Sequence, residues 1–383
     1  MAAQYWGKQD AASIEKVIPI ALRTNLLFSG LFTILAGFCP EMLMRIFTND
    51  AALVASGSQY LRAVALSYVL CGISQVYLIL LKNTGHAAVS SRISSTAVVL
   101  NIILNAILIY GLCGAPALGI RGAAYATVAA RVVELIWAYL ETKKPERVRI
   151  LWNRLFSSAG KILSEDFWRY TLPVLAASLV WGIAYVLYSV IMGHMGSDAV
   201  AANSITSIAK SLLSCLIRGV SGGAGVLIGN LLGANELEKA REYGRRLSHL
   251  SIAIGIVTGG LLMLISPAIV HFAPLSDTAA EYLQYMLLFC GLNLMAQSVN
   301  TTVLDGIFCA GGDAKFDMQG NIGAMWCFSV PLGFLAAFWL KLPVMVVYCI
   351  VNLDEIVKLP AVYHHYKKYI WVRNITRDVE DLS

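Results

Sequence analysis

Residues 93–112 read ISSTAVVLNIILNAILIYGL, and these twenty positions contain no charged side chain. A helix needs about 20 mostly apolar residues to cross the hydrocarbon layer of a bilayer, so this stretch is long enough to span a membrane. Hydrophobic residues make up 58% of the 383 residues, against roughly 45–50% in an average soluble domain, and charged residues only 14%. The sequence therefore predicts an all-α polytopic membrane protein.

Other segments match the same template, and we expect about ten membrane-spanning helices. Their approximate limits are 18–39, 60–81, 93–112, 118–140, 172–193, 199–231, 248–273, 282–304, 322–340 and 342–363. The segment 199–231 is the least apolar, because Lys210 and Arg218 interrupt it. A helix of that kind is expected to face protein or water rather than lipid.

The positions of Lys and Arg predict the orientation, because basic loops stay on the cytoplasmic side of a membrane. The connection 141–171, the segment after Leu232 and the tail after Tyr363 are basic, whereas the connections 194–200 and 274–281 contain no Lys or Arg. With an even number of spans, all of these basic segments lie on the cytoplasmic side. We predict a multi-pass protein of the cell membrane with both termini in the cytoplasm. The basic residues never form one continuous stripe, which argues against a nucleic-acid partner.

The two parts of the chain resemble each other, in the same direction, at an offset of about 227 residues. The matches are QYWGKQD at 4–10 with NLLGANE at 230–236, Pro40 and Asp50 with Pro267 and Asp277, and Gly85 with Gly312. They predict two pseudo-symmetric bundles, and on this interpretation two helices are absent from the front of the first copy. The expected domains are an N-terminal bundle with four spans (1–141), a cytoplasmic amphipathic linker (142–170), a C-terminal bundle with six spans (171–365) and a cytoplasmic tail (366–383).

Three stretches resemble a known family. They are LNIILNAILIYGLCGAPALGIRGAAYAT at 100–127, GGAGVLIGNLLGANELEKA at 222–240 and GIFCAGGDAKF at 306–316. With Trp181, WCF at 326–328 and Pro331, their order is similar to that of bacterial members of the multidrug and toxic compound extrusion (MATE) family. The resemblance covers nearly the whole chain. This sequence differs from the family pattern at Cys309, where many relatives have Arg. It also differs in helix one, which in relatives supplies a membrane-embedded Asp to an ion site and which is one of the two helices that are absent on this interpretation.

The resemblance implies a V-shaped pair of bundles that open alternately to either side of the membrane. Members of the family export amphipathic, often cationic, compounds against a gradient of Na+ or H+. The resemblance therefore implies a small-molecule substrate, a coupling ion in place of a cofactor, and a chain that works as a monomer in the lipid bilayer.

Placing an ionisable side chain inside a membrane-spanning helix costs free energy, so each such residue is a candidate for function. Asp305 lies near the end of the 282–304 segment, close to Asn300, and is the main candidate to carry a proton or to bind Na+. The alternative is that Asp305 is solvated, because it lies about one turn from the Gly311–Gly312 loop. Gln297 and Asn203 are expected to add polar groups for the substrate or the ion.

Aromatic residues form a stripe on the 172–193 segment. Trp181, Tyr185 and Tyr188 recur at spacings of four and three, so they share one face of a helix. Such a stripe packs against other helices or binds flat cations by cation–π contact. Pro331 lies in the middle of a span, where it is expected to kink or break the helix and to act as a hinge.

Polar residues in the first bundle allow two interpretations. Asn101 and Asn105 lie four apart and either face a cavity or hold helices together. Glu134 either faces the substrate or pairs with Arg131, three residues earlier. In the second bundle, pairing is expected for the residues Asp354, Glu355 and Lys358. Lys210 and Arg218 either extend to the membrane surface, contact an anionic group or pair with nearby acids, and pairing is favoured.

The favoured function is secondary active efflux of amphipathic, cationic compounds by alternating access, coupled to Na+ or H+ antiport, with no catalytic residue and no bound metal. One alternative is a lipid-linked oligosaccharide flippase of the same superfamily, which would need several cations for a pyrophosphate. Another is an inactive, truncated transporter. A membrane enzyme is disfavoured, because His364 and His365 adjoin aromatic and basic residues with no carboxylate at ligand spacing.

Overall fold

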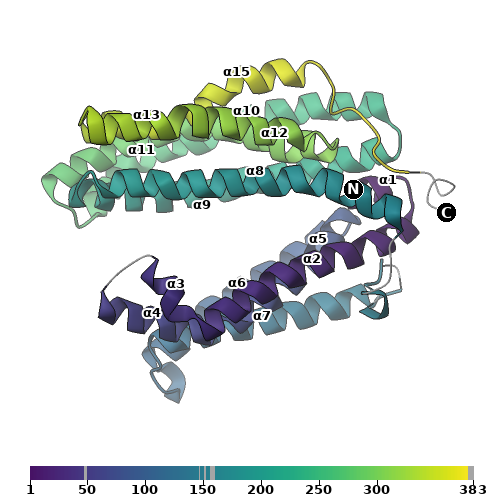
Figure 1. Ribbon diagram of the computed structural model, residues 1–383, viewed down its shortest axis with the longest axis horizontal. Coiled ribbons are helices and arrows are strands. Elements are labelled where there is room, and N and C mark those ends of the chain that lie inside the picture. Colours follow the sequence, from purple (N-terminus) through teal and green to yellow (C-terminus); the bar gives the residue numbers. More distant parts are fainter. Residues whose placement is uncertain (47–49, 146, 151, 156–159, 378–383) are drawn as a thin grey trace.

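The computed structural model describes residues 1–46, 50–145, 147–150, 152–155 and 160–377. In this part of the chain all regular secondary structure is helical. The helices form two bundles that converge at the end carrying both termini and diverge toward the opposite end (Figure 1). We call helices α1 to α7 the N-bundle and α8 to α15 the C-bundle. The predicted all-α membrane fold with two bundles is confirmed.

The N-bundle contains two short helices, α1 and α3, and five longer ones. Its helices are α1 (Ala2–Gly7), α2 (Ala11–Phe38), α3 (Pro40–Arg45), α4 (Ala51–Val64), α5 (Leu66–Asn83), α6 (Ala87–Tyr110) and α7 (Ile120–Thr142). Asp10 and Asp50 cap α2 and α4, because their carboxylates accept hydrogen bonds from the first free backbone N–H groups. The single span predicted at 60–81 is wrong in its limits, since α4 and α5 meet there at Ala65.

The C-bundle contains longer helices. They are α8 (Lys161–Gly193), α9 (Ser197–Gly233), α10 (Leu237–Phe272), α11 (Asp277–Thr301), α12 (Ala314–Asn321), α13 (Val330–Phe334), α14 (Val344–Val351) and α15 (Asp354–Tyr366). Among the described residues, nine helical runs are long and apolar enough to cross a membrane. The tenth predicted span, 342–363, is instead the pair α14 and α15, which are separated at Asn352 and Leu353.

Two helices of the C-bundle start earlier than predicted. α8 begins at Lys161 and α10 at Leu237, so Lys161 and Arg169 lie on α8, and the basic residues that follow Leu232 lie on the first turns of α10. Pairs along the helix surface support these polar turns, such as Lys239 with Glu236 at 2.8 Å. The predicted amphipathic linker therefore ends before Lys161. Its residues 146, 151 and 156–159 lie outside the described residues.

Pro331 does not break its helix. The helical run from Ala314 to Trp339 is continuous, and its turns widen to the π-helical form at Ile322–Ser329 and again at Leu335–Trp339. Proline lacks the N–H that an α-helical turn uses, and widened turns are a known way to accommodate such a defect. The hinge role of Pro331 stays a prediction.

The internal repeat is visible in the backbone. Gln9 and Asn235 occupy matching positions and both have positive φ angles, of 63° and 60°. Gly85 and Gly312 also match, with φ angles of 80° and 73°. Left-handed backbone at equivalent positions shows that the two copies make the same turns between helices.

The two copies meet through residues that the repeat aligns. α1 crosses α9 so closely that a Cβ atom on Gly7 would lie 2.0 Å from the carbonyl oxygen of Asn230. In the same way, a Cβ on Gly233 would lie 1.8 Å from the carbonyl oxygen of Gln4. Only glycine fits at either position. This reciprocal crossing, which we call the glycine junction, holds the bundles together at their converging end.

The segment 371–377 crosses the same end of the molecule. The Trp371 side chain is fully buried. The amide of Ile375 donates to Gln4 Oε1 at 2.8 Å, and Gln4 Nε2 donates to the carbonyl of Ala310 at 2.7 Å. Arg377 donates to the buried Asp166 carboxylate on α8, at 2.8 and 3.2 Å. The C-terminal segment therefore ties α1 to the C-bundle.

Replacing Asp166 by Asn should lower the free energy of unfolding by about 1–3 kcal/mol, because a charge-assisted pair of hydrogen bonds to Arg377 is weakened. Thermal unfolding of the purified protein in detergent measures the change. Glu165→Gln is the matched control, since Glu165 is the exposed neighbour on the same helix. Equal melting temperatures for both variants would show that the Arg377 contact adds nothing to stability.

Candidate functional site

A polar cavity lies inside the C-bundle, and the space between its lining side chains, including the part that is open to solvent, is about 900 Å³. We call it the C-bundle cavity. Five helical segments line it, from α8, α9, the α11 region, α12 and α15. Its polar and aromatic lining residues are Ser178, Trp181, Arg218, Gln297, Asn300, Thr301, Asp305, Asp317, Asn321, Glu355 and Lys358.

A buried network forms one wall of this cavity. Lys358 Nζ lies 3.2 Å from Glu355 Oε1 and 3.8 Å from Asp354 Oδ2. It also donates to Asn321 Oδ1 at 3.2 Å, and the amide of Asn321 donates to Asp317 at 3.1 Å. All of these side chains are buried. The predicted pairing of Asp354 and Glu355 with Lys358 is confirmed, and the ammonium group holds α12 and α15 together.

Lys358→Met should lower the free energy of unfolding by about 3 kcal/mol, because it leaves two buried carboxylates without their cation. A drop in the melting temperature of the detergent-solubilised protein measures this loss. Lys239→Met serves as control, since Lys239 also pairs with a glutamate but is exposed. An unchanged melting temperature for Lys358→Met would contradict the structural role of the network.

Asp305 lies apart from this network. It belongs to the π-helical stretch Thr302–Phe308 that continues α11, and its side chain is exposed to the cavity. Ser221 on α9 donates to the carbonyl of Thr301 at 2.8 Å and so satisfies a backbone group beside the widened turns. Among the described residues Asp305 has no ion pair and no hydrogen bond. It is therefore an open acceptor for a cation.

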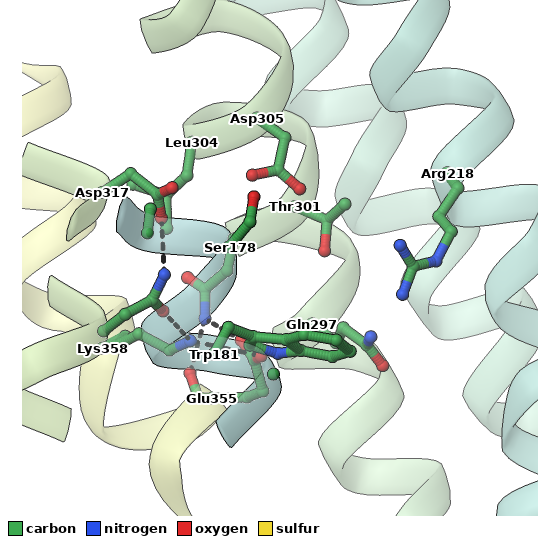
Figure 2. Close-up of a pocket in the computed structure, with 14 residues that line it drawn as sticks. Ser178, Trp181, Arg218, Gln297, Thr301, Leu304, Asp305, Asp317, Glu355 and Lys358 are labelled. Atoms are coloured by element: carbon green, nitrogen blue, oxygen red, sulfur yellow. Dashed lines mark hydrogen bonds and ion pairs between the residues drawn. The ribbon is translucent and has the colours of Figure 1, made fainter. Parts of the chain in front are cut away.

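An aromatic ring and a guanidinium group line the same cavity as Asp305. Trp181 stacks on Tyr185, with ring centroids 5.4 Å apart and planes 15° from parallel. The guanidinium carbon of Arg218 lies 5.9 Å from the Trp181 ring centroid. Figure 2 shows Asp305 and Arg218 on different helices, with Gln297 and Trp181 nearby. The structure thus brings Asp305, Asn300, Gln297 and Trp181 together, as expected of one site.

The remaining aromatic candidates line a second, much smaller cavity. Tyr185, Tyr188 and Asn203 meet there, with Lys210 on α9. Lys210 Nζ donates to the neutral amide oxygen of Asn293 at 3.1 Å. The prediction that Lys210 and Arg218 pair with acids is wrong, because neither cation has an acidic partner among the described residues. Both lie on α9, whose neighbours at these positions are aromatic or amide side chains.

The candidates of the N-bundle are not part of either cavity. Asn105 donates to Asn101 Oδ1 at 3.1 Å, and Asn101 donates to Thr127 at 3.4 Å. Glu134 is buried and pairs with Arg131 at 2.5 Å. For Asn101 and Asn105 the structure favours the interpretation that they hold helices together, and for Glu134 it favours pairing with Arg131, although the predicted role of all three in binding is not tested.

Two buried polar residues of the C-bundle cavity are absent from the sequence-based candidates. Asp317 and Asn321 lie on α12, ahead of the span predicted at 322–340. Their spacing of four places both on one face of a helix, and that pattern was the available signal. It was missed because the span was expected to begin one residue after Asn321.

The chain is similar to known transporters. A family model described as MatE matches residues 1–107 and 173–335. The uncharacterized transporter YisQ of Bacillus subtilis is 20% identical over 97% of this chain and 81% of its own length. The "probable multidrug resistance protein" YoeA of the same organism is 21% identical, over 99% of this chain and 82% of its own.

A solved structure shares the fold. It shows the outward-facing conformation of a multidrug resistance MATE family transporter of the MOP superfamily. The TM-score is 0.84 at 19% sequence identity, with 96% of this chain and 81% of that chain covered. This likeness extends over both bundles.

Proposed function

Because the chain belongs to the MatE family of transporters, we propose that it exports amphipathic compounds with a cationic group across the cell membrane, in exchange for Na+ or H+. The observation that carries this proposal is Asp305. An acidic side chain in a membrane-spanning helix is expensive, and such residues mark ion pathways or proton relays. Asp305 forms no hydrogen bond or ion pair with the residues that the structure describes, and it opens into a cavity that also presents an aromatic ring. A metal cation, a proton or an organic cation can each neutralise it.

Competition for one carboxylate is a simple way to couple two fluxes. While the coupling cation occupies Asp305, an organic cation is displaced from the cavity; when the coupling cation leaves, the site is available again. Each of the two cations then lowers the apparent affinity of the cavity for the other, as thermodynamic linkage requires. The buried ion-pair network around Lys358 remains in place during the exchange and keeps the cavity in shape.

The shape of the molecule supports alternating access. The bundles diverge at the end opposite both termini (Figure 1). With the termini in the cytoplasm, as the basic loops predict, this conformation is open to the outside. An external cation can then enter the C-bundle cavity and release the compound there. Opening to the cytoplasm requires the glycine junction and the C-terminal segment to separate.

The alternative as a flippase for lipid-linked oligosaccharides receives less support. A pyrophosphate would need several free cations in one cavity, but Lys358 is held by two carboxylates. Arg218 is then the only unpaired cation among the described residues that line the C-bundle cavity.

A transport assay tests the proposal. Purified protein is reconstituted into proteoliposomes with a fluorescent cationic dye, and a Na+ or a proton gradient is imposed separately. We expect one of the two gradients to drive the dye against its concentration gradient. Dye movement that is the same with and without both gradients would contradict coupled efflux. Liposomes without protein provide the background rate.

A further inference from the structure

The smaller cavity of the C-bundle surrounds Lys210 on α9. The space between its lining side chains, including the part that is open to solvent, is about 400 Å³, which is less than half that of the C-bundle cavity. Side chains of α8, α9 and the end of α14 form its walls. Of the described residues that line it, only Met192 and Val351 have apolar side chains. We call this polar space the Lys210 cavity.

Lys210 brings a positive charge into this cavity without an ion pair. Its ammonium group donates to Asn293 Oδ1, a neutral acceptor, at 3.1 Å. Asp354 and Glu355 act on Lys210 only from beyond ion-pair distance. Both carboxylates contact Lys358 instead, at 3.8 and 3.2 Å. A cation without a counter-ion inside a membrane-spanning helix costs free energy, and a bound anion would lower that cost.

Donors for an anion lie on one face of α9. Asn203, Ser207 and Lys210 are spaced by four and three residues, so they share one side of the helix, and all three line the cavity. The amide of Asn203 and the hydroxyl of Ser207 form no hydrogen bond with the residues that the structure describes. An ammonium group has three N–H donors, and only one of them is directed to Asn293. This face of α9 therefore offers an ammonium, a hydroxyl and an amide donor to the same space.

A buried tyrosine adds a donor from another helix. Tyr348 on α14 is 3% exposed and lines the Lys210 cavity, yet its hydroxyl has no hydrogen-bond partner in the described part of the chain. Buried polar groups are almost always hydrogen-bonded, so a hydroxyl left without a partner points to a bound ligand or water. An anion accepts hydrogen bonds only, and donors are what these side chains provide.

The charge and the lining of the cavity together select the kind of ligand. A cation would be repelled by Lys210, and no Asp or Glu lines this cavity within the residues described. A divalent anion would leave an excess negative charge inside the membrane, whereas a monovalent anion balances Lys210. Polar walls offer little contact to the apolar part of an amphipathic compound. A small monovalent inorganic anion meets all of these conditions.

We propose that the Lys210 cavity binds one small monovalent anion of the size of chloride, with Lys210 as its counter-ion and Asn203, Ser207 and Tyr348 as neutral hydrogen-bond donors. The bound anion neutralises Lys210 and joins α9 to α14. This inference concerns a different cavity from the one used in the proposed function and does not depend on that function.

Thermal unfolding of the purified full chain in detergent tests the site. Sodium gluconate is replaced stepwise by sodium chloride, so that the Na+ concentration and the ionic strength stay constant. We expect the melting temperature to rise with chloride along a one-site saturation curve, by about 2 °C, because the anion binds only the folded protein. Bromide should act like chloride. Sulfate, which is divalent and larger, should have no such effect.

Three variants locate the anion. Lys210→Met should abolish the response to chloride, because the counter-ion is removed. Ser207→Ala should raise the chloride concentration at half-saturation by about fivefold, since one neutral hydrogen bond is lost. Lys315→Met is the matched control, because Lys315 is an exposed lysine of α12 that lines neither cavity. It should keep the wild-type response.

A second measurement needs no variant. Crystals of the wild-type protein grown in bromide should show anomalous scattering from one bromide ion beside Lys210. Equal melting temperatures of the wild-type protein in chloride and gluconate would overturn the inference, and so would bromide found only away from Lys210. A chloride response that survives in Lys210→Met would overturn it as well, because the anion would then bind elsewhere. None of these outcomes bears on whether dye efflux is coupled to Na+ or protons.

Discussion

Replacing Asp305 by Asn should reduce gradient-driven dye efflux on the order of tenfold or more, because the amide keeps the size of the side chain but cannot exchange a proton or balance a cation. Asp305 makes no contact that holds the fold together, so the variant should be recovered as folded protein with a wild-type melting temperature. Efflux from proteoliposomes and thermal unfolding measure the two quantities separately.

Glu281→Gln is the matched control for this experiment. Glu281 is an exposed acid in the first turns of α11, at the opposite end of the same helical run. We expect it to transport dye at the wild-type rate. If Asp305→Asn also kept the wild-type rate and its dependence on the gradient, another group would have to carry the coupling cation.

Replacing Gly233 by Leu should prevent recovery of folded protein. A Cβ at this position would lie 1.8 Å from the carbonyl oxygen of Gln4, and backbone cannot avoid it by changing a rotamer. The cost should exceed the about 1–3 kcal/mol that an ordinary overpacked core shows. Size-exclusion chromatography of the detergent extract shows whether a monodisperse protein remains.

Gly223→Leu provides the comparison on the same helix. A Cβ on Gly223 meets no atom within 4 Å, so this variant should yield a monodisperse protein. A normal yield of Gly233→Leu would mean that α1 does not cross α9 at this distance in the membrane. Gly7→Leu should behave like Gly233→Leu, because the repeat places Gly7 in the equivalent position against Asn230.

The sequence predicted the fold well because the hydrocarbon layer of a bilayer excludes charged residues from the helices that span it. Long uncharged stretches such as 93–112 have few alternatives to a membrane-spanning helix. Helix ends were harder to predict. The polar turns at the start of α10 are held by ion pairs along the helix surface, which hydropathy does not report. The break between α14 and α15 lies at Asn352 and Leu353, directly before Asp354 and Glu355, and the predicted span 342–363 ran through these polar residues.

The site was predicted less completely. Asp305, Gln297 and Trp181 were candidates by residue type, and the structure brings them together. The partners of charged residues depend on which helices lie next to each other, and spacing along one helix does not determine that. For this reason the pairing of Lys358 was predictable from its own helix, whereas Arg218 beside Trp181 was not.

The most direct test of the account is competition between dye and coupling cation at equilibrium. Binding of a fluorescent cationic dye to purified wild-type protein is measured while the concentration of Na+ or of protons is raised separately. We expect one of these cations to release the dye from the wild-type protein and to have little effect on the residual binding of Asp305→Asn. Dye binding by the wild-type protein that is independent of both cations would contradict the shared use of the C-bundle cavity.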